Sequence, residues 1–170
     1  MSKRKTYEEP TLTATLRAIA EHLEEETDAY LIAGGAMMFY GLKTSTKDID
    51  IVFTGTETLN SFIEAAKKAG LRLDETLLKE YRNMGASAIM TADSGLQLDL
   101  FNQTVCSALT VKDTVIARTR RHTDIGKLHI NLMSPEDIVL FKGITEREAD
   151  LEDIRTLTQT GIDWKTVEEE

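Results

Sequence analysis

Two aspartates one residue apart, Asp48 and Asp50, are the side chains of this chain most clearly arranged for chemistry. They belong to an apolar segment, 47–53, which is predicted to form a strand. Side chains alternate along a strand, so both carboxylates point to one face while Ile49 points into a core. Two such carboxylates repel each other unless a cation lies between them, and Mg²⁺ takes oxygen ligands together with a substrate's phosphates. The pair therefore predicts a metal site that accepts a phosphorylated molecule.

A double glycine, Gly34-Gly35, precedes Asp48 with twelve residues between them. It follows a predicted strand, 29–33, and leads into a predicted short helix, 36–41. Glycine lets a phosphate approach the backbone closely, and the first N–H groups of a helix favour anions. Thr46 and Lys47, beside the second strand, are further candidates for phosphate contact, with exposed loop residues as the alternative. Because a glycine pair alone is usually a turn, the phosphate hypothesis depends on the combination.

A third aspartate, Asp99, lies in another apolar segment, 96–101. Alternation predicts that Leu98 faces the core while Asp99 faces outward with Gln97. If this strand lies next to the first pair, three carboxylates converge on one metal site.

A second constellation lies near the C-terminus. Residues 134–137, Ser-Pro-Glu-Asp, predict the start of a helix, because serine caps, proline fits the first position and acids favour the dipole. Lys142 borders the buried stripe of this helix, so it either extends outward or reaches an anion inside. Asp150 and Asp153 share a face of the next helix. Pairing of Lys142 and Arg147 with these acids in a structural network between helices is the alternative.

The first constellation resembles the nucleotidyltransferase superfamily that includes DNA polymerase beta. Its signature is Gly-Gly or Gly-Ser and, about ten residues later, carboxylate-apolar-carboxylate-apolar, here Asp48-Ile49-Asp50-Ile51. The second is similar to the C-terminal motif of AbiEii-type toxin nucleotidyltransferases and their small DUF6036 relatives. In that motif a lysine, an arginine and an aspartate pair follow a Ser-Pro-Glu-Asp helix start. The resemblance covers roughly residues 28–160, and it departs at Ala149, where relatives often carry a lysine.

The resemblance implies transfer of a nucleoside monophosphate from an NTP to a hydroxyl, with Mg²⁺ or Mn²⁺ as cofactor. Two-metal transfer of this kind places the ions roughly 3.5–4 Å apart. It also implies roles: metal ligands Asp48, Asp50 and Asp99; a triphosphate cradle from Gly34 and Gly35; phosphate or acceptor contact from Lys142; nucleotide contact from Arg147; and a second shell or acceptor groove from Asp150 and Asp153.

Several acceptors and one non-catalytic function stay open. The hydroxyl belongs to RNA, above all tRNA as in toxin relatives, or to a protein, as in antitoxin relatives. The alternatives are an antitoxin-like module that binds a nucleotide or a partner toxin or antitoxin protein without catalysis, and an antibiotic-modifying nucleotidyltransferase. The net charge of −9 disfavours RNA. The basic segment 118–122 is more simply explained as a solvated hairpin turn.

The elements that must position these residues predict an α+β fold, with mixed α/β character: a small mixed sheet flanked by helices. We expect one domain over 1–170, with a core of about 28–132 and a helical part of about 134–170. The predicted helices include 10–26, 57–69 and one from 148 that turns Leu151, Ile154 and Leu157 inward. The remaining strands pair as 86–92 with 96–101 and 114–118 with 127–132.

Composition excludes a protein with a transmembrane helix and a protein stabilised by internal disulfides. The longest apolar runs are too short for a transmembrane helix, so no membrane partner is expected. A single cysteine, Cys106, allows no internal disulfide, and a reducing cytoplasm is the expected location.

Overall fold

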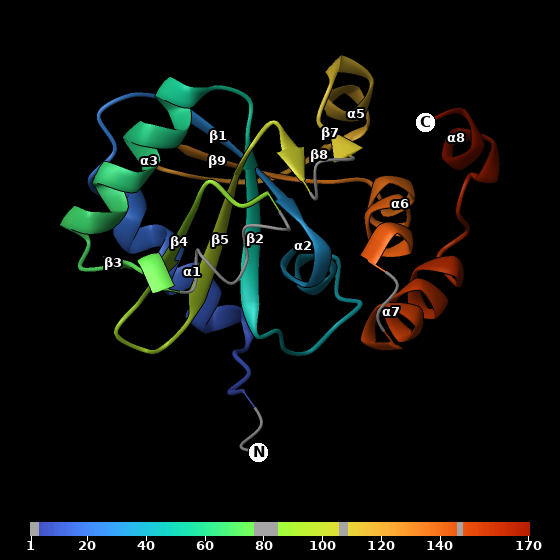
Figure 1. Ribbon diagram of the computed structural model, residues 1–170, viewed down its shortest axis with the longest axis horizontal. Coiled ribbons are helices and arrows are strands. Elements are labelled where there is room, and N and C mark those ends of the chain that lie inside the picture. The colour runs from blue at the N-terminus through green and yellow to red at the C-terminus, as the bar shows by residue number, and fades with distance from the viewer. Residues whose placement is uncertain (1–3, 77–84, 106–108, 146–147) are drawn as a thin grey trace.

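The computed structural model describes residues 4–76, 85–105, 109–145 and 148–170, so Cys106 and Arg147 lie outside the described residues. Its helices and strands are mixed along the chain, and the last three elements are helices (Figure 1). In chain order they are α1 (Glu9–Ala20), β1 (Thr27–Ile32), α2 (Ala33–Phe39), β2 (Asp48–Phe53), α3 (Thr56–Lys68), β3 (Arg72–Leu73), β4 (Ala88–Thr91), β5 (Gln97–Asn102), β6 (Thr104–Val105), β7 (Leu109–Thr110), α5 (Asp113–Arg118), β8 (Arg120–Ile125), β9 (Leu128–Leu132), α6 (Pro135–Thr145), α7 (Glu148–Thr158) and α8 (Trp164–Glu169).

Within these residues, seven strands form one mixed sheet in the order β3-β4-β5-β2-β1-β9-β8. The pairs β2–β5 and β1–β9 are parallel, while the other neighbours are antiparallel. Strands β6 and β7 form a separate two-stranded ribbon. The predicted α+β class, a mixed sheet flanked by helices, is confirmed. Among the described residues, no helix is both long and apolar enough to cross a membrane.

Helices cover the central strands and leave room for polar side chains on β2. The rings of Phe53 on β2 and Phe62 on α3 lie 4.9 Å apart, so α3 covers the face to which Phe53 points. Helix α1 packs beside α3, and α2 contacts β1, β2 and α6 (Figure 1). Because side chains alternate along β2, Asp48 and Asp50 point to the face opposite Phe53.

Two predictions about the segment before β9 are wrong. Residues 114–118 lie in helix α5 instead of a strand, and the basic segment is largely part of strand β8 instead of a turn. The β-branched Val115 and Ile116 favour a strand locally, which explains the first error. The chain actually turns at Gly126, whose φ of 57° suits glycine, so the strand that pairs with β9 is the one directly before it.

Two helix predictions also need correction. Helix α1 ends at Ala20 instead of residue 26, and the run Glu24–Glu26 beyond it is acidic, which disfavours the C-terminal end of a helix. In α7 the predicted inward position of Leu151 is wrong, because this side chain is 64% exposed. The predicted inward position of Leu157 is confirmed, and Asp150 and Asp153 are buried with it.

Candidate active site

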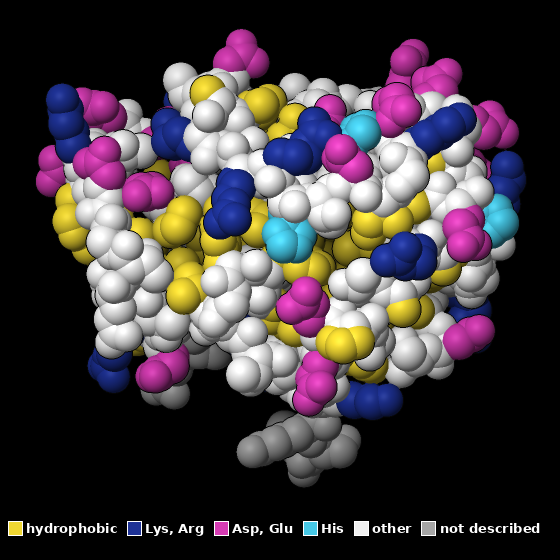
Figure 2. All heavy atoms as spheres, turned by 180° about the vertical axis from the view of Figure 1, so that it is seen from behind, with side chains coloured by type: hydrophobic (Ala, Val, Ile, Leu, Met, Phe, Trp, Pro, Cys, Tyr) yellow, Lys and Arg dark blue, Asp and Glu magenta, His cyan; other side chains and the backbone are white. Residues whose placement is uncertain are grey.

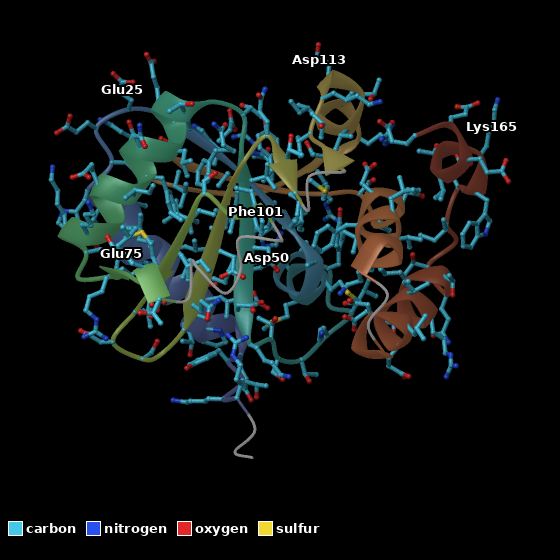
Figure 3. The ribbon with its side chains drawn as sticks, viewed as in Figure 1. Glu25, Asp50, Glu75, Phe101, Asp113 and Lys165 are labelled. Atoms are coloured by element: carbon cyan, nitrogen blue, oxygen red, sulfur yellow. The ribbon has the colours of Figure 1, made fainter. Side chains whose placement is uncertain are left out.

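The parallel pairing of β2 with β5 places Asp50 opposite Asp99 and Asp48 opposite Gln97. One carboxylate oxygen from each of the three aspartates lies within 4.8 Å of the others. Figure 3 shows Asp50 on β2, near the middle of the sheet. Asp99 was expected to face outward, but only 2% of it is exposed, because the side of the sheet to which it points is covered. The structure therefore brings the predicted triad together in a buried place.

Burial and mutual repulsion raise the pKa of two carboxylates of the triad, those of Asp50 and Asp99, in the absence of a metal. Burial raises the pKa of Asp50 well above its usual range, Asp48 and Asp99 raise it further, and Lys142 opposes the rise. Burial, aided by Asp48, raises the pKa of Asp99 to about 6, although the hydrogen bond from Gln97 opposes the shift. Two buried carboxylates that are costly to ionise, with the carboxylate of Asp48 beside them, suit a divalent cation, and an oxygen-only donor set suits Mg²⁺ or Mn²⁺.

A cavity of about 350 Å³ joins the triad to other predicted site residues. It is open enough for a ligand to reach the carboxylates from solvent. The predicted residues that line it are Gly34, Thr46, Lys47, Asp48, Asp50, Asp99, Lys142, Asp150 and Asp153, and the others are Arg4, Thr6, Ala33, Lys43, Ser45 and Phe141.

The two glycines of the double glycine have different surroundings. Both belong to the first turn of α2, where a strand had been predicted to lead directly into them. At Gly34 an added Cβ would lie 2.7 Å from Thr46 Oγ1, so a side chain would displace Thr46 and fill the cavity. At Gly35 it would lie 3.4 Å from Ile49 Cγ2. Gly34 keeps the backbone accessible from the cavity, whereas Gly35 allows α2 to pack closely on β2.

The opposite wall of the cavity is an ion-pair network between α6 and α7. Lys142 Nζ lies 3.0 Å from Asp150 Oδ1 and 2.7 Å from Asp153 Oδ2, and only 3% of Lys142 is exposed. Lys43 Nζ, from the loop before β2, lies 3.1 Å from the same oxygen of Asp153. Lys142 thus reaches an anion inside. The network proposed as a structural alternative exists, and it also faces the candidate site.

The predicted start of α6 positions Lys142. Ser134 Oγ accepts a hydrogen bond from the backbone N–H of Asp137 at 3.2 Å and donates one to its carboxylate at 2.7 Å. Arg118, at the end of α5, pairs with Asp137 at 2.7 Å. These contacts cap α6 and hold it against the segment that leads into β8.

A family model described as "Nucleotidyl transferase of unknown function", DUF2204, matches residues 12–168, which is nearly the whole chain. The chain belongs to this DUF2204 family. No curated protein matches the sequence. The DUF2204 protein is therefore a nucleotidyltransferase by family, in agreement with the superfamily that its motifs predicted.

Solved structures show the same fold. The DUF2204 protein is similar to a Thermotoga maritima protein, TM1012, assigned as a nucleotidyltransferase, with 14% identity, a TM-score of 0.57, and 91% of this chain and 96% of that chain covered. It is also similar to the antibiotic-resistance factor ANT(2'')-Ia, with 14% identity, a TM-score of 0.59, and coverage of 89% and 84%. At this identity the two likenesses establish the fold alone.

Three side chains that contact the triad or the ion-pair network were not predicted as site residues: Arg4, Lys43 and Gln97. Lys43 lies in the spacer between the double glycine and Asp48, so its position in the motif was an available signal. Gln97 is two residues before Asp99 on the same strand and shares its face, which alternation does indicate. Arg4 had no local signal, because its position depends on contacts far along the chain.

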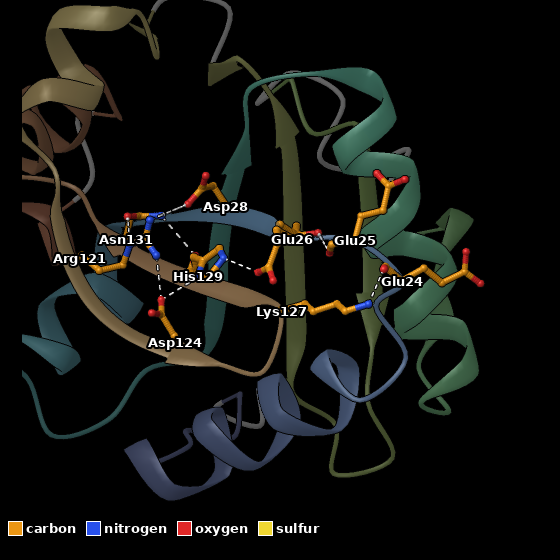
Figure 4. Close-up of polar contacts among 10 residues, drawn as sticks. Glu24, Glu25, Glu26, Asp28, Arg121, Asp124, Lys127, His129 and Asn131 are labelled. Carbon is orange, nitrogen blue, oxygen red and sulfur yellow. Dashed lines mark hydrogen bonds and ion pairs between the residues drawn. The ribbon is translucent and has the colours of Figure 1, made fainter.

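The basic segment of the DUF2204 protein lies apart from the cavity, and its Arg118 and Arg121 are paired with acids. Arg121 contacts Asp28 at 3.3 Å and Asp124 at 2.8 Å (Figure 4). His129 lies between Asp124 and Glu26, at 2.7 and 2.6 Å, and chiefly the bond to Asp124 raises the pKa of this imidazole. On the face seen in Figure 2, the Lys and Arg side chains of the described residues are interspersed with Asp and Glu and form no continuous basic patch.

Proposed function

We propose that the DUF2204 protein transfers a nucleoside monophosphate from an NTP to a hydroxyl group, with Mg²⁺ or Mn²⁺ held by Asp48, Asp50 and Asp99. The observation that carries this proposal is the meeting of these carboxylates in one cavity with Gly34 and Lys142. The oxygen donors and their repulsion fit a divalent cation, which when bound would neutralise charge on the phosphates.

The side chains of the cavity have distinct roles in this proposal. The backbone at Gly34, with Thr46 and Lys47, binds the triphosphate, and Lys142 contacts a phosphate or the acceptor. The acceptor oxygen forms a bond to the α-phosphorus, and the bond from that phosphorus to pyrophosphate breaks. The hydroxyl proton passes to the carboxylate of Asp99.

For the acceptor we propose a protein hydroxyl before a tRNA hydroxyl. The net charge of −9 and the pairing of Arg121, on β8, with Asp28 and Asp124 are poorly suited to a phosphate backbone. A protein acceptor fits an AbiEii-type toxin–antitoxin system, in which the chain modifies a partner protein. This kinship rests on the motif that includes Lys142, Asp150 and Asp153.

A small cationic molecule is the second candidate acceptor. Asp150 and Asp153 line a cavity of about 350 Å³, which lies in the size range of small-molecule sites. Their carboxylates suit amino groups of an acceptor that competes with Lys142 and Lys43. The antibiotic-resistance factor ANT(2'')-Ia shares the fold, and any likeness of substrate is part of this second proposal.

A labelling experiment tests both proposals. Purified protein is incubated with Mg²⁺ and each NTP labelled on the α-phosphate, together with tRNA, a bacterial protein extract or a panel of aminoglycosides. Label that survives nuclease treatment and resides in protein supports the first proposal, and label on an aminoglycoside supports the second. Label lost on nuclease treatment identifies an RNA acceptor. Asp48→Asn is the control, and equal transfer by this variant contradicts the assigned metal site.

A further inference from the structure

Residues 4–7, which we call the strap, lead into α1 (Figure 1), and Arg4 and Thr6 of the strap line the cavity. Tyr7 exchanges two backbone hydrogen bonds with Thr46, at 2.8 and 3.0 Å. Its hydroxyl donates to the carbonyl of Ser94, in the turn between β4 and β5, at 3.1 Å. Only 7% of Tyr7 is exposed. The strap is therefore fixed to the loop before β2 and to the β4–β5 turn.

The β4–β5 turn is shaped to receive this tyrosine. Gly95 has a φ of 93°, and a Cβ added there would lie 2.6 Å from the Tyr7 hydroxyl. A side chain at Gly95 would therefore be strained by the backbone and would also displace the Tyr7 ring. Contacts with residues far along the chain therefore fix the position of the strap in the folded protein.

The strap places the guanidinium of Arg4 beside the carboxylate triad. Nη1 lies 3.5 Å from Asp48 Oδ2, and Nη2 donates to Gln97 Oε1 at 3.0 Å. Gln97 in turn donates to Asp99 Oδ1 at 2.6 Å. The ion pair with Asp48 is long and 44% of the Arg4 side chain is exposed, so the pair contributes little to stability. The strap is therefore fixed by buried contacts, whereas the pair between Arg4 and Asp48 is long and partly exposed.

We propose that Arg4 binds the β- and γ-phosphates of the NTP, and that it leaves Asp48 when a divalent cation binds there. A cation on Asp48 satisfies the carboxylate and repels the guanidinium, which then requires another anion. The fork of Arg suits two phosphate oxygens, and Lys43 and Lys47 line the same cavity. This inference rests on the proposed nucleotidyl transfer.

Calorimetric titration tests the exchange in the full-length protein. Wild type, Arg4→Ala and Arg4→Lys are titrated with Mn²⁺ alone, and then, at saturating Mn²⁺, with a non-hydrolysable NTP and with the matching NMP. Lys5→Ala is the matched control, because it removes the same charge from the same strap, where Lys5 lies over the Tyr7 ring.

We expect Arg4→Ala to weaken NTP binding about tenfold or more, with NMP binding unchanged. Mn²⁺ alone should bind Arg4→Ala as tightly as wild type or more tightly, because a competing cation is gone. The NTP affinity of Arg4→Lys should lie between those of wild type and Arg4→Ala, and the NTP affinity of Lys5→Ala should match that of wild type.

Three results would overturn the assignment of Arg4. The first is unchanged NTP affinity in Arg4→Ala. The second is an equal loss of affinity for NTP and NMP in Arg4→Ala. The third is a loss of NTP affinity in Lys5→Ala equal to that in Arg4→Ala. These results leave the proposed function standing, because wild type still binds the NTP. If wild type binds no NTP at saturating Mn²⁺, the proposed function and the role of Arg4 fall together.

Discussion

At the scale of single residues, the pKa of Asp99 depends on its surroundings in the folded sheet more than on the residues beside it in the sequence. Leu98 and Leu100 flank it and would suit any buried strand, but parallel pairing puts Asp99 opposite Asp50. The sequence therefore predicted which aspartates meet but placed Asp99 outward, since hydrophobic alternation gives no information on what covers the polar face of a strand. Because Asp99 is buried, its ionisation makes the free energy of unfolding depend on pH.

The metal-free protein should lose stability as pH rises from about 4 through 6. Asp99 has a folded pKa of about 6 against an ordinary value of 3.8, so between these values the folded state binds more protons than the unfolded state. Under this condition the free energy of unfolding falls with rising pH, by on the order of 1–3 kcal/mol for this group. Urea unfolding in EDTA across this range measures the slope.

Asp99→Asn is the control for this slope, because the amide does not titrate. Its metal-free unfolding free energy should fall less with pH than that of wild type. Asp50, whose folded pKa is also raised, supplies a slope of the same sign that remains in the variant. An identical slope in wild type and Asp99→Asn would show that Asp99 ionises normally in the folded protein.

Lys142→Ala should destabilise the protein by about 3 kcal/mol as well as weaken NTP binding. Lys142 is buried between Asp150 and Asp153, so its removal leaves two buried carboxylates without the cation that pairs with both of them. Urea unfolding measures the loss. A loss below about 1 kcal/mol would mean that the network is solvated like a surface ion pair.

At the scale of elements, local signals predicted those that have caps or alternating apolar residues. The Ser134 cap of α6, strand β2 with its aspartates and the β4–β5 hairpin agree with the structure. Helix α5 was mistaken for a strand because its β-branched residues have no strand partner, which a local pattern does not reveal. In α7 the spacing of apolar residues predicted that Leu151 faces the core. Lys142 and Lys43, from other elements, instead allow the acidic face with Asp150 and Asp153 to be buried.

The orientation of α7 can be tested with two leucines six residues apart. Leu157 is fully buried, so Leu157→Ala should lower the free energy of unfolding by about 2–5 kcal/mol. Leu151 is exposed, so Leu151→Ala should change it by less than about 0.5 kcal/mol. Urea unfolding of both variants decides, and similar losses would support the inward Leu151 that the periodicity predicted.

At the scale of the whole molecule, the candidate site is a cavity closed by segments far apart in sequence. The strap that carries Arg4, the paired strands β2 and β5, and helices α6 and α7 each supply part of its lining. The sequence indicated the strand and helix contributions separately, through motifs. It did not indicate the contribution of the strap, because the Tyr7–Thr46 pairing that places Arg4 is a long-range contact without a motif.

The central claim is that Asp48, Asp50 and Asp99 form a metal-dependent nucleotide site, and thermal melts of wild type and Asp50→Asn test it most directly. In EDTA, Asp50→Asn should melt no lower than wild type, because it removes a buried carboxylate that two others repel. Saturating Mn²⁺ with a non-hydrolysable NTP should stabilise wild type by about 2.7 kcal/mol or more, at a hundredfold excess over the dissociation constant. The same ligands should leave the melting temperature of Asp50→Asn unchanged. A wild-type melting temperature that Mn²⁺ and NTP do not raise, or an Asp50→Asn variant that they stabilise equally, would contradict the claim.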